Sequence, residues 1–424
     1  MKILFAAGDF DAQLHATNKI VYSVARSLAQ KGHECIFAGL SLFDNACTGY
    51  SDGLKLVRIN STHPCDTAFL SLENFVRKSG LPREKAKKKF YFAHPLHTAA
   101  LLYRYNIGKK ELYCTDSYAK QIRQLAEAEK PDLLVVSYMP FVQNFALVTQ
   151  YKWDIPVIAW QLDPWGLHRA GSMQPCQAQH ISQETTLFEH CTRIVTTPVL
   201  YRQYSLHPDY HSYLDKMVPL NFPNVKPLPQ YSPDDCVFRF DDDTVNLLFC
   251  GIVHDEYRNP QFLLETLKAV REKGFTRFRV HFLGTNESGI LRQFASQHDW
   301  VVHHGNVPLE KAFATMYCSD VLINIGNTYD NQVPSKIFDY FAFGKPVITI
   351  EKIKDCPAAE YFARYPLALS LQEWSGSSAD AVAVGEFLAG SKDMQLSFSQ
   401  TEALFCDCTL GYATDVFCDI INQI

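Results

Sequence analysis

The alternation of short apolar runs with amphipathic segments is the feature that most constrains this chain's fold. The first apolar run, "KILFAAGDF", ends in a glycine turn, and "TNKIVYSVARSLAQKGH" follows with apolar residues at helical spacing. Thr17 is predicted to cap this helix and Gly32 to end it. A second run, "ECIFAGL", completes a strand, a helix and a strand, which predicts a βαβ unit and a parallel sheet.

The same pattern recurs along the chain in two blocks. "PDLLVVS", "IPVIAW" and "TRIVTT" predict strands in the first block, and "VNLLFCG", "FRVHFLG", "WVVHHG", "DVLINIG" and "KPVITI" predict strands in the second. Between the blocks, "NFPNVKPLPQYSPDDCVFRFDDD" is rich in Pro and Asp and has no sustained period, which is typical of a linker.

We therefore expect an α/β protein with two doubly wound Rossmann-like domains. The N-terminal domain spans residues 1–220, the linker 221–243 and the C-terminal domain 244–395. A C-terminal helical segment, residues 396–424, is expected to pack back on the N-terminal domain. Ligands of such domains bind at the carboxyl ends of the strands.

Composition excludes several classes of function. The formal net charge of −5 over 424 residues argues against bulk binding of nucleic acid. The 13 cysteines are scattered and form no C-x-x-C pair, so a zinc site is not expected and reduced, cytoplasmic thiols fit best. We expect neither a signal peptide in "MKILFAAGDFDAQ" nor a membrane span, which needs roughly 18 uninterrupted apolar residues.

The stretch "NTYDNQVPSKIFDYFAFGKPVITI" carries a set of polar groups where a strand gives way to a helix. A helix that begins near Pro334 offers free N–H groups and a positive dipole end to an anion such as phosphate. Ser335 adds a hydroxyl and Lys336 a cation, and Asp339 falls on the same helical face. An equal alternative is that Ser335 only caps the helix, Lys336 is solvated and Asp339 offsets the dipole.

Over residues 245–350, the order and spacing of "LLFCG…YRNP…VHFLG…HGNVP…VPSKIFDYFAFGKPVI" resemble the donor-binding domain of GT-B glycosyltransferases. The similarity is greatest to the mostly retaining group that builds bacterial surface polysaccharides. It implies two domains facing a cleft, and transfer of a sugar from a nucleotide-diphosphate donor to a hydroxyl of a glycan or lipid-linked acceptor. The N-terminal half resembles the family only in its general layout.

The resemblance also implies roles for individual residues. Arg258, in "YRNP", and Lys336 would contact the donor diphosphate, and Asp339 would bind the ribose where Glu is more usual. An acid that often contacts the donor sugar is replaced by "YDNQ", so Asp330 or Asn331 is an approximate substitute. The remaining donor-side positions are the close-approach glycines and the base-holding loop: Gly251, Gly284, Gly305, Asn306 and Val307. The alternative for Arg258 is a surface arginine at a helix start.

The N-terminal half would hold the acceptor. The candidate residues follow predicted strands: Gly8, Asp9, His15, Asn18 and, after a later strand, Asp163. If the enzyme inverted configuration, one of them could be the general base. If it retained configuration, which the resemblance favours, the departing phosphate oxygen would take the proton. Turn capping is an equal alternative for His15 and Asp163. No metal or cofactor is expected, because the helix N-terminus, Arg258 and Lys336 can neutralise the diphosphate.

One clearly basic run, residues 83–92, begins at Arg83 and ends at Phe92. It is interpreted either as a solvated helix face or as a patch that docks on anionic lipid headgroups, which would place a cytoplasmic enzyme at the inner face of the membrane. His94 and His97 follow in "HPLH" and are interpreted as non-metal, since no acidic or Cys partner is close in sequence.

Two other functions remain open from the sequence. One is a nucleotide-sugar epimerase on the same two-domain plan, which needs no acceptor. The other is a non-catalytic relative that binds nucleotides or partners. The presence of Arg258, Lys336 and Asp339 counts against the non-catalytic alternative.

Overall fold

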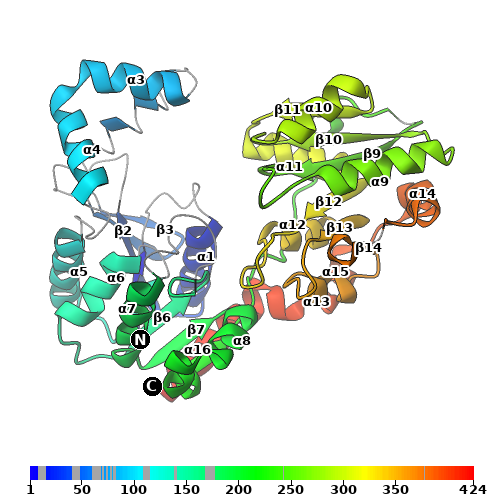
Figure 1. Cartoon of the computed structure of the whole chain (residues 1–424). Coiled ribbons are helices and arrows are strands. Elements are labelled where there is room, and N and C mark those ends of the chain that lie inside the picture. Colours follow the sequence, from blue (N-terminus) through cyan, green and yellow to red (C-terminus); the bar gives the residue numbers. More distant parts are fainter. Residues whose placement is uncertain are drawn as a thin grey trace. The chain divides into compact units, whose positions relative to one another are not determined.

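The computed structural model describes residues 1–7, 16–40, 48–59, 68, 71–72, 75–76, 79, 83–107, 115–137, 141–167, 177–241, 243–376 and 378–424. These residues form two compact units, shown in Figure 1. The first unit comprises Met1–Phe222 together with Leu410–Ile424, and the second comprises Pro223–Thr409. Each unit has one sheet of mostly or entirely parallel strands with helices on both sides, as expected from the recurring βαβ pattern.

The first unit is built on an eight-stranded sheet in the order β3-β4-β2-β1-β5-β6-β7-β8. Only β3 and β4 pair antiparallel among its described strands. Its central strands are buried on both faces, which is typical of a parallel sheet covered by helices. The strands are β1 (Lys2–Ala7), β2 (Glu34–Leu40), β3 (Thr48–Ser51), β4 (Leu54–Ile59), β5 (Leu133–Ser137), β6 (Val157–Gln161), β7 (Arg193–Thr196) and β8 (Met217–Pro219).

The described helices of the first unit are α1 (Ala16–Gln30), α3 (Arg83–Ala93), α4 (Pro95–Ile107), α5 (Thr115–Glu129), α6 (Phe141–Gln150), α7 (Gln177–Glu189), α8 (Pro198–Leu206) and α16 (Leu410–Gln423). Helix α1 buries the apolar face predicted by its spacing, including Val24 and Leu28. The predicted cap at Thr17 is wrong, because α1 already begins at Ala16. Gly32 follows the helix with φ +94°, a left-handed conformation that suits glycine.

The second unit has a six-stranded sheet in the order β11-β10-β9-β12-β13-β14, and all its neighbouring strands pair parallel. The strands are β9 (Val245–Cys250), β10 (Phe278–Leu283), β11 (Val301–Gly305), β12 (Val321–Ile325), β13 (Val347–Glu351) and β14 (Ala368–Gln372). The order of strands reverses between β9 and β12. In open α/β sheets, the carboxyl ends of the strands at such a switch point are where ligands bind.

Helices of the second unit connect these strands. They are α9 (Gln261–Glu272), α10 (Gly289–Gln297), α11 (Leu309–Cys318), α12 (Lys336–Phe343), α13 (Ala359–Arg364), α14 (Ala381–Gly390) and α15 (Phe398–Leu404). The Pro- and Asp-rich stretch that precedes β9 holds one short 3-10 turn, Pro233–Asp235, and an isolated bridge between Val225 and Thr409. Among the described residues, no helix has the length and apolar character needed to cross a membrane.

The C-terminal helix α16 belongs to the first unit. Phe417 is fully buried, and its ring centroid lies 4.7 Å from that of Trp160 in β6. Thr414 Oγ1 donates a hydrogen bond to Ser27 Oγ of α1 at 2.9 Å, and Lys31 forms an ion pair with Asp415. The last residues of the chain therefore complete the core around its first helix.

We expect Phe417→Ala to lower the free energy of unfolding of the first unit by about 3–5 kcal/mol, because the change leaves a cavity beside Trp160. Denaturant unfolding followed by tryptophan fluorescence measures this loss. Asn422→Ala, on the exposed face of the same helix, is the matched control and should change stability by less than about 0.5 kcal/mol. Equal losses in the two variants would show that the Phe417 contact does not anchor α16.

Candidate functional site

Two glycines lie directly after the carboxyl ends of neighbouring strands in the second unit. Gly251 follows β9 with φ +143°, and Gly284 follows β10 with φ +119°. A Cβ atom on Gly284 would lie 2.3 Å from the carbonyl oxygen of Gly251, which is inside van der Waals contact. The two backbones at this edge therefore pack at a distance that a side chain on Gly284 would not allow.

The side chain of Lys336, the first residue of α12, extends to the carboxyl end of β9, beside Gly251. Its Nζ donates a hydrogen bond to the carbonyl oxygen of Cys250 at 3.1 Å and lies 4.1 Å from the ring centroid of Phe249. A Cβ on Gly251 would lie 3.4 Å from the same Nζ. The alternative of a solvated Lys336 is therefore wrong: the ammonium group is enclosed at the end of β9.

The pKa of Lys336 is lowered to about 7. Burial is the main cause, because it disfavours the charged form, and repulsion by the Arg258 guanidinium adds to it. Near neutral pH, Lys336 is thus divided between its charged and neutral forms, and an anion bound nearby would restore the proton.

Arg258 lies in the turn that follows β9. Its backbone N–H donates to the carbonyl of His254 at 3.1 Å, which closes the turn. Its Nε donates to Oδ1 of Asn327 at 3.2 Å, and Asn327, two residues past the end of β12, is 4% exposed. Arg258 is half-buried, and its guanidinium is oriented by the hydrogen bond to Asn327.

Sequence reasoning missed Asn327. The available signal was a polar residue directly after the glycine that ends the predicted strand "DVLINIG". Because β9 and β12 are neighbours at the switch point, Arg258 and Asn327 meet there although they are far apart in sequence.

The N-terminus of α12 distinguishes the two interpretations of Ser335. Ser335 has helical backbone angles and makes no side-chain capping bond, so the interpretation as a cap only is wrong. Asp339 lies half-buried in the first turn of α12, where its negative charge also complements the helix dipole. The negative charge of Asp339 helps to raise the pKa of the Cys250 thiol and of the Tyr340 hydroxyl, so the carboxylate lies near the same end of the strands.

The remaining donor-side candidates lie around the same strand ends. Asn306 follows β11, is exposed, and accepts a hydrogen bond at Oδ1 from the Thr285 hydroxyl at 3.1 Å. Val307 beside it is half-buried. Asn331, in the loop before α12, is buried. Asp330 in the same loop is half-buried.

Residues 244–360, which contain this site, match the family model described as Glycosyl transferases group 1. The chain therefore contains a glycosyltransferase domain of this family. A search of curated proteins gave no match.

Solved structures support the GT-B fold of the glycosyltransferase over its whole length. A sucrose-phosphate synthase from Thermosynechococcus elongatus superposes with a TM-score of 0.63 at 12% identity, covering 100% of this chain and 98% of that one. A UDP-forming trehalose-phosphate synthase from Burkholderia xenovorans gives 0.56 at 11% identity, covering 99% and 98%. An E. coli trehalose-6-phosphate structure bound with UDP-2-fluoro glucose gives 0.56 at 10% identity, covering 100% and 99%. At these identities the likeness shows the shared fold.

The N-terminal unit of the glycosyltransferase contains the acceptor-side candidates. Gly8, Asp9 and His15 lie outside the described residues. Asn18 lies in α1 and is 2% exposed. Asp163 follows β6 in a turn and is half-buried.

A buried carboxyl group that the sequence did not reveal supports the turn containing Asp163. Glu184 of α7 is fully buried and accepts hydrogen bonds from the Tyr204 hydroxyl at 2.9 Å, the Tyr210 hydroxyl at 2.5 Å and the Gly166 N–H at 3.1 Å. Burial raises the pKa of Glu184 to about 7 although these donors favour its charged form. The sequence around it, "HISQETTLFE", reads as an ordinary polar helix and gives no sign of this role.

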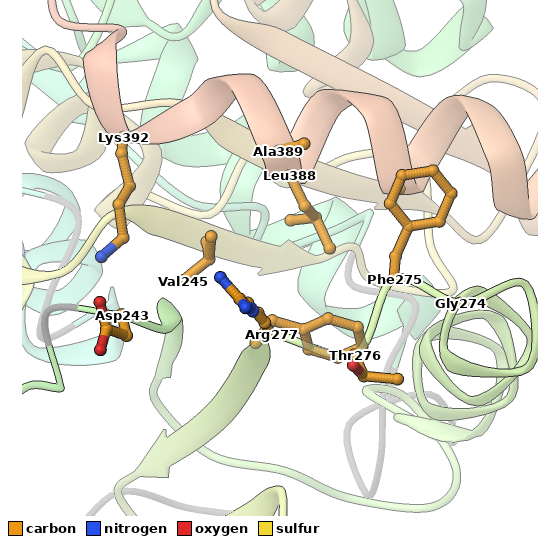
Figure 2. Close-up of a pocket in the computed structure, with 11 residues that line it drawn as sticks. Asp243, Val245, Gly274, Phe275, Thr276, Arg277, Leu388, Ala389 and Lys392 are labelled. Atoms are coloured by element: carbon orange, nitrogen blue, oxygen red, sulfur yellow. The ribbon is translucent and has the colours of Figure 1, made fainter.

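A cavity of about 480 Å³ lies at the opposite edge of the second sheet, beside the first residues of β9 and β10 (Figure 2). Val245, Phe275 and Leu388 form apolar walls, and Arg277 and Lys392 lie at its rim. The Phe275 ring packs directly against Gly385, because a Cβ atom on Gly385 would lie 2.3 Å from the ring. This cavity is separate from the edge that holds Lys336 and Arg258.

We expect Gly284→Ala to destabilise the second unit more than Gly274→Ala. Both positions have positive φ, which costs an alanine about 1–2 kcal/mol. Only Gly284 also places the new Cβ against backbone, because the space around Gly274 is open within 4 Å. Thermal unfolding of the two variants measures the difference, and equal losses would contradict the close approach of the chain at Gly284.

Because burial raises the pKa of Glu184, we expect the free energy of unfolding of the first unit to depend on pH. Its pKa is raised from 4.5 to about 7 on folding, so its favourable contribution is complete below pH 4.5 and is lost as pH rises through 7. Relative to Glu184→Gln, the wild type should lose about 3 kcal/mol between pH 4.5 and pH 8. Urea unfolding of both proteins across this range measures the loss. Parallel stability curves for the two proteins would show that Glu184 does not titrate in this range.

Proposed function

We propose that this glycosyltransferase moves a sugar from a nucleoside-diphosphate donor to a hydroxyl of a glycan or lipid-linked acceptor, with retention of configuration. One observation carries the proposal: two cations, Arg258 and Lys336, converge at the switch point of the second sheet and repel each other. A bound diphosphate is negatively charged, so it would attract both basic side chains and offset the repulsion between them.

The electrostatic argument rests on the described partners of the Lys336 Nζ, which are the Cys250 carbonyl oxygen and the rings of Phe249 and Tyr340. None of these three partners carries a full negative charge. As the bond between sugar and phosphate breaks, negative charge develops on the departing diphosphate, and fixed cations stabilise that charge. Arg258 is already oriented by Asn327, so it needs little reorganisation on binding.

The other donor-side residues have roles that follow from their chemistry. The Asp339 carboxylate accepts hydrogen bonds from the two ribose hydroxyls, and Asn306 and Val307 border the base. Asn331 and Asp330 lie in the loop toward the donor sugar. No metal is needed for diphosphate binding in this proposal, because Arg258, Lys336 and the N-terminus of α12 supply the positive potential.

Retention requires that the new bond form on the face from which the old bond leaves. The bond from the sugar C1 to the phosphate oxygen breaks, and a bond from C1 to the acceptor oxygen forms. The acceptor proton passes to the departing phosphate oxygen, so no protein base is required. In an inverting reaction, Asp163 would be the candidate base on the acceptor side.

The proposed acceptor is a hydroxyl group of a glycan or of a lipid-linked glycan precursor. A hydroxyl acceptor on a surface polysaccharide precursor, in the cytoplasm, fits the sequence resemblance. The E. coli relative bound with UDP-2-fluoro glucose supports a nucleotide-sugar donor. The experiment must therefore test the donor site without knowledge of the acceptor.

We expect nucleoside-diphosphate binding to be coupled to proton uptake by Lys336. At pH 8 its amine is mostly neutral in the free protein, because its pKa is about 7, and the bound anion raises that pKa. A thermal-shift panel of UDP, GDP and ADP first identifies the preferred nucleotide. Calorimetric titration in two buffers of different ionisation enthalpy should then show uptake of close to one proton, and affinity should fall as pH rises from 7.5 to 8.5.

Lys336→Arg is the matched control for this measurement, since arginine stays charged throughout the range and should bind without proton uptake. Arg258→Ala and Asp339→Ala should weaken nucleotide binding at least tenfold, whereas Arg277→Ala, at the opposite edge of the sheet, should not. If no nucleotide stabilises the wild type, the assigned site is wrong. Conversion of a nucleotide sugar to its epimer without transfer would instead support an epimerase.

A further inference from the structure

Helix α3 presents one continuous basic stripe to solvent. Lys85, Lys88, Lys89 and Phe92 are all exposed, and their spacing of three, four and seven residues from Lys85 places them on one helical face. Among the described residues, no ion pair involves these three lysines. The stripe therefore carries three positive charges on a chain whose net charge is −5.

The other face of α3 fixes the orientation of this stripe. Ala86 and Phe90 are buried, and Phe90 packs with Ala68 and Leu72 in a small apolar cluster. The rings of His94 and His97 lie against Phe90, with centroids 4.6 Å and 6.0 Å away. Both histidines thus have a packing role, and the lysine face is held away from this cluster.

Large apolar side chains border the lysines. Phe92 ends the stripe at 93% exposed, and Leu96, four residues further along the chain at the start of α4, is 85% exposed. Leu102 of α4 is 56% exposed. A solvated helix face accounts for the lysines, but it does not account for a phenylalanine and a leucine left almost fully in water beside them.

We propose that α3 and the start of α4 dock on an anionic lipid bilayer. Lysines would attract anionic headgroups, and Phe92 and Leu96 would enter the boundary between headgroups and acyl chains. The combination of clustered cations with adjacent exposed apolar residues is complementary to such a surface in both charge and hydrophobicity. This docking is independent of the donor chemistry, because it involves none of the donor-site residues.

Flotation of the full-length protein with lipid vesicles tests the proposal. The wild type should bind vesicles of phosphatidylcholine with 30% phosphatidylglycerol and bind pure phosphatidylcholine vesicles at least tenfold more weakly. Binding should weaken as salt is raised, because the headgroup attraction is screened. The triple variant K85E/K88E/K89E should lose at least about a hundredfold in partitioning, because each basic residue near the surface contributes about a factor of five and each glutamate adds repulsion from the anionic headgroups.

Two further variants separate this surface from general charge and from misfolding. Phe92→Ser should weaken binding to the anionic vesicles about tenfold, because it removes the apolar ring without changing any charge. The matched control K268E/K273E/K311E changes three exposed lysines of the second unit and should bind vesicles with less than a threefold loss. All variants should keep the wild-type thermal unfolding temperature within 2–3 degrees and the same nucleotide-induced shift.

Absence of wild-type binding to anionic vesicles would overturn the proposal. Equal loss in the control triple variant would also overturn it, because the attraction would then be non-specific. Wild-type affinity in Phe92→Ser would exclude apolar insertion and leave a purely electrostatic surface, contrary to the proposal. A failure of nucleotide binding in the wild type would bear on the donor site and not on this surface, so the two proposals fail separately.

Discussion

The contact between the Lys336 side chain and the end of β9 is the interaction on which the proposed chemistry of the second unit depends. The hydrogen bond from Lys336 to the Cys250 carbonyl joins the start of α12 to the end of β9. Repulsion between Lys336 and Arg258 makes the free site electrostatically unfavourable. The fold of the surrounding sheet holds these groups in place, and in the proposed donor site a bound anion would relieve the repulsion between them.

The same arrangement explains why the architecture could be predicted from the sequence while much of the site could not. Strands such as "VNLLFCG" and "DVLINIG" are continuous apolar runs closed by glycine, and such runs reveal parallel strands directly. Lys336 and Ser335 were found because they stand at a visible strand-to-helix junction. Whether Lys336 was solvated or enclosed could not be decided, because that depends on Phe249 and Cys250, 86 residues away for the latter.

Other features require the tertiary structure altogether. Asn327 and Arg258 meet only because β9 and β12 are neighbours, and strand order cannot be read from periodicity. Glu184 has three hydrogen-bond partners that come from the turn after β6, from α8 and from the 3-10 segment that follows α8. The antiparallel strand β3 and the edge strand β14 are short and only partly buried, so their apolar patterns are too weak to predict a strand.

In the proposed donor site, the close approach of Gly284 to Gly251 limits how donor preference could change. Where the two backbones touch, no side chain lies between them, so this part of the proposed site cannot distinguish one base or sugar from another by its side chains. In the proposal, discrimination therefore resides in neighbouring side chains, such as exposed Asn306 and the loop that holds Asp330 and Asn331. Diversification of donor preference would proceed through those loops while the glycines stay fixed.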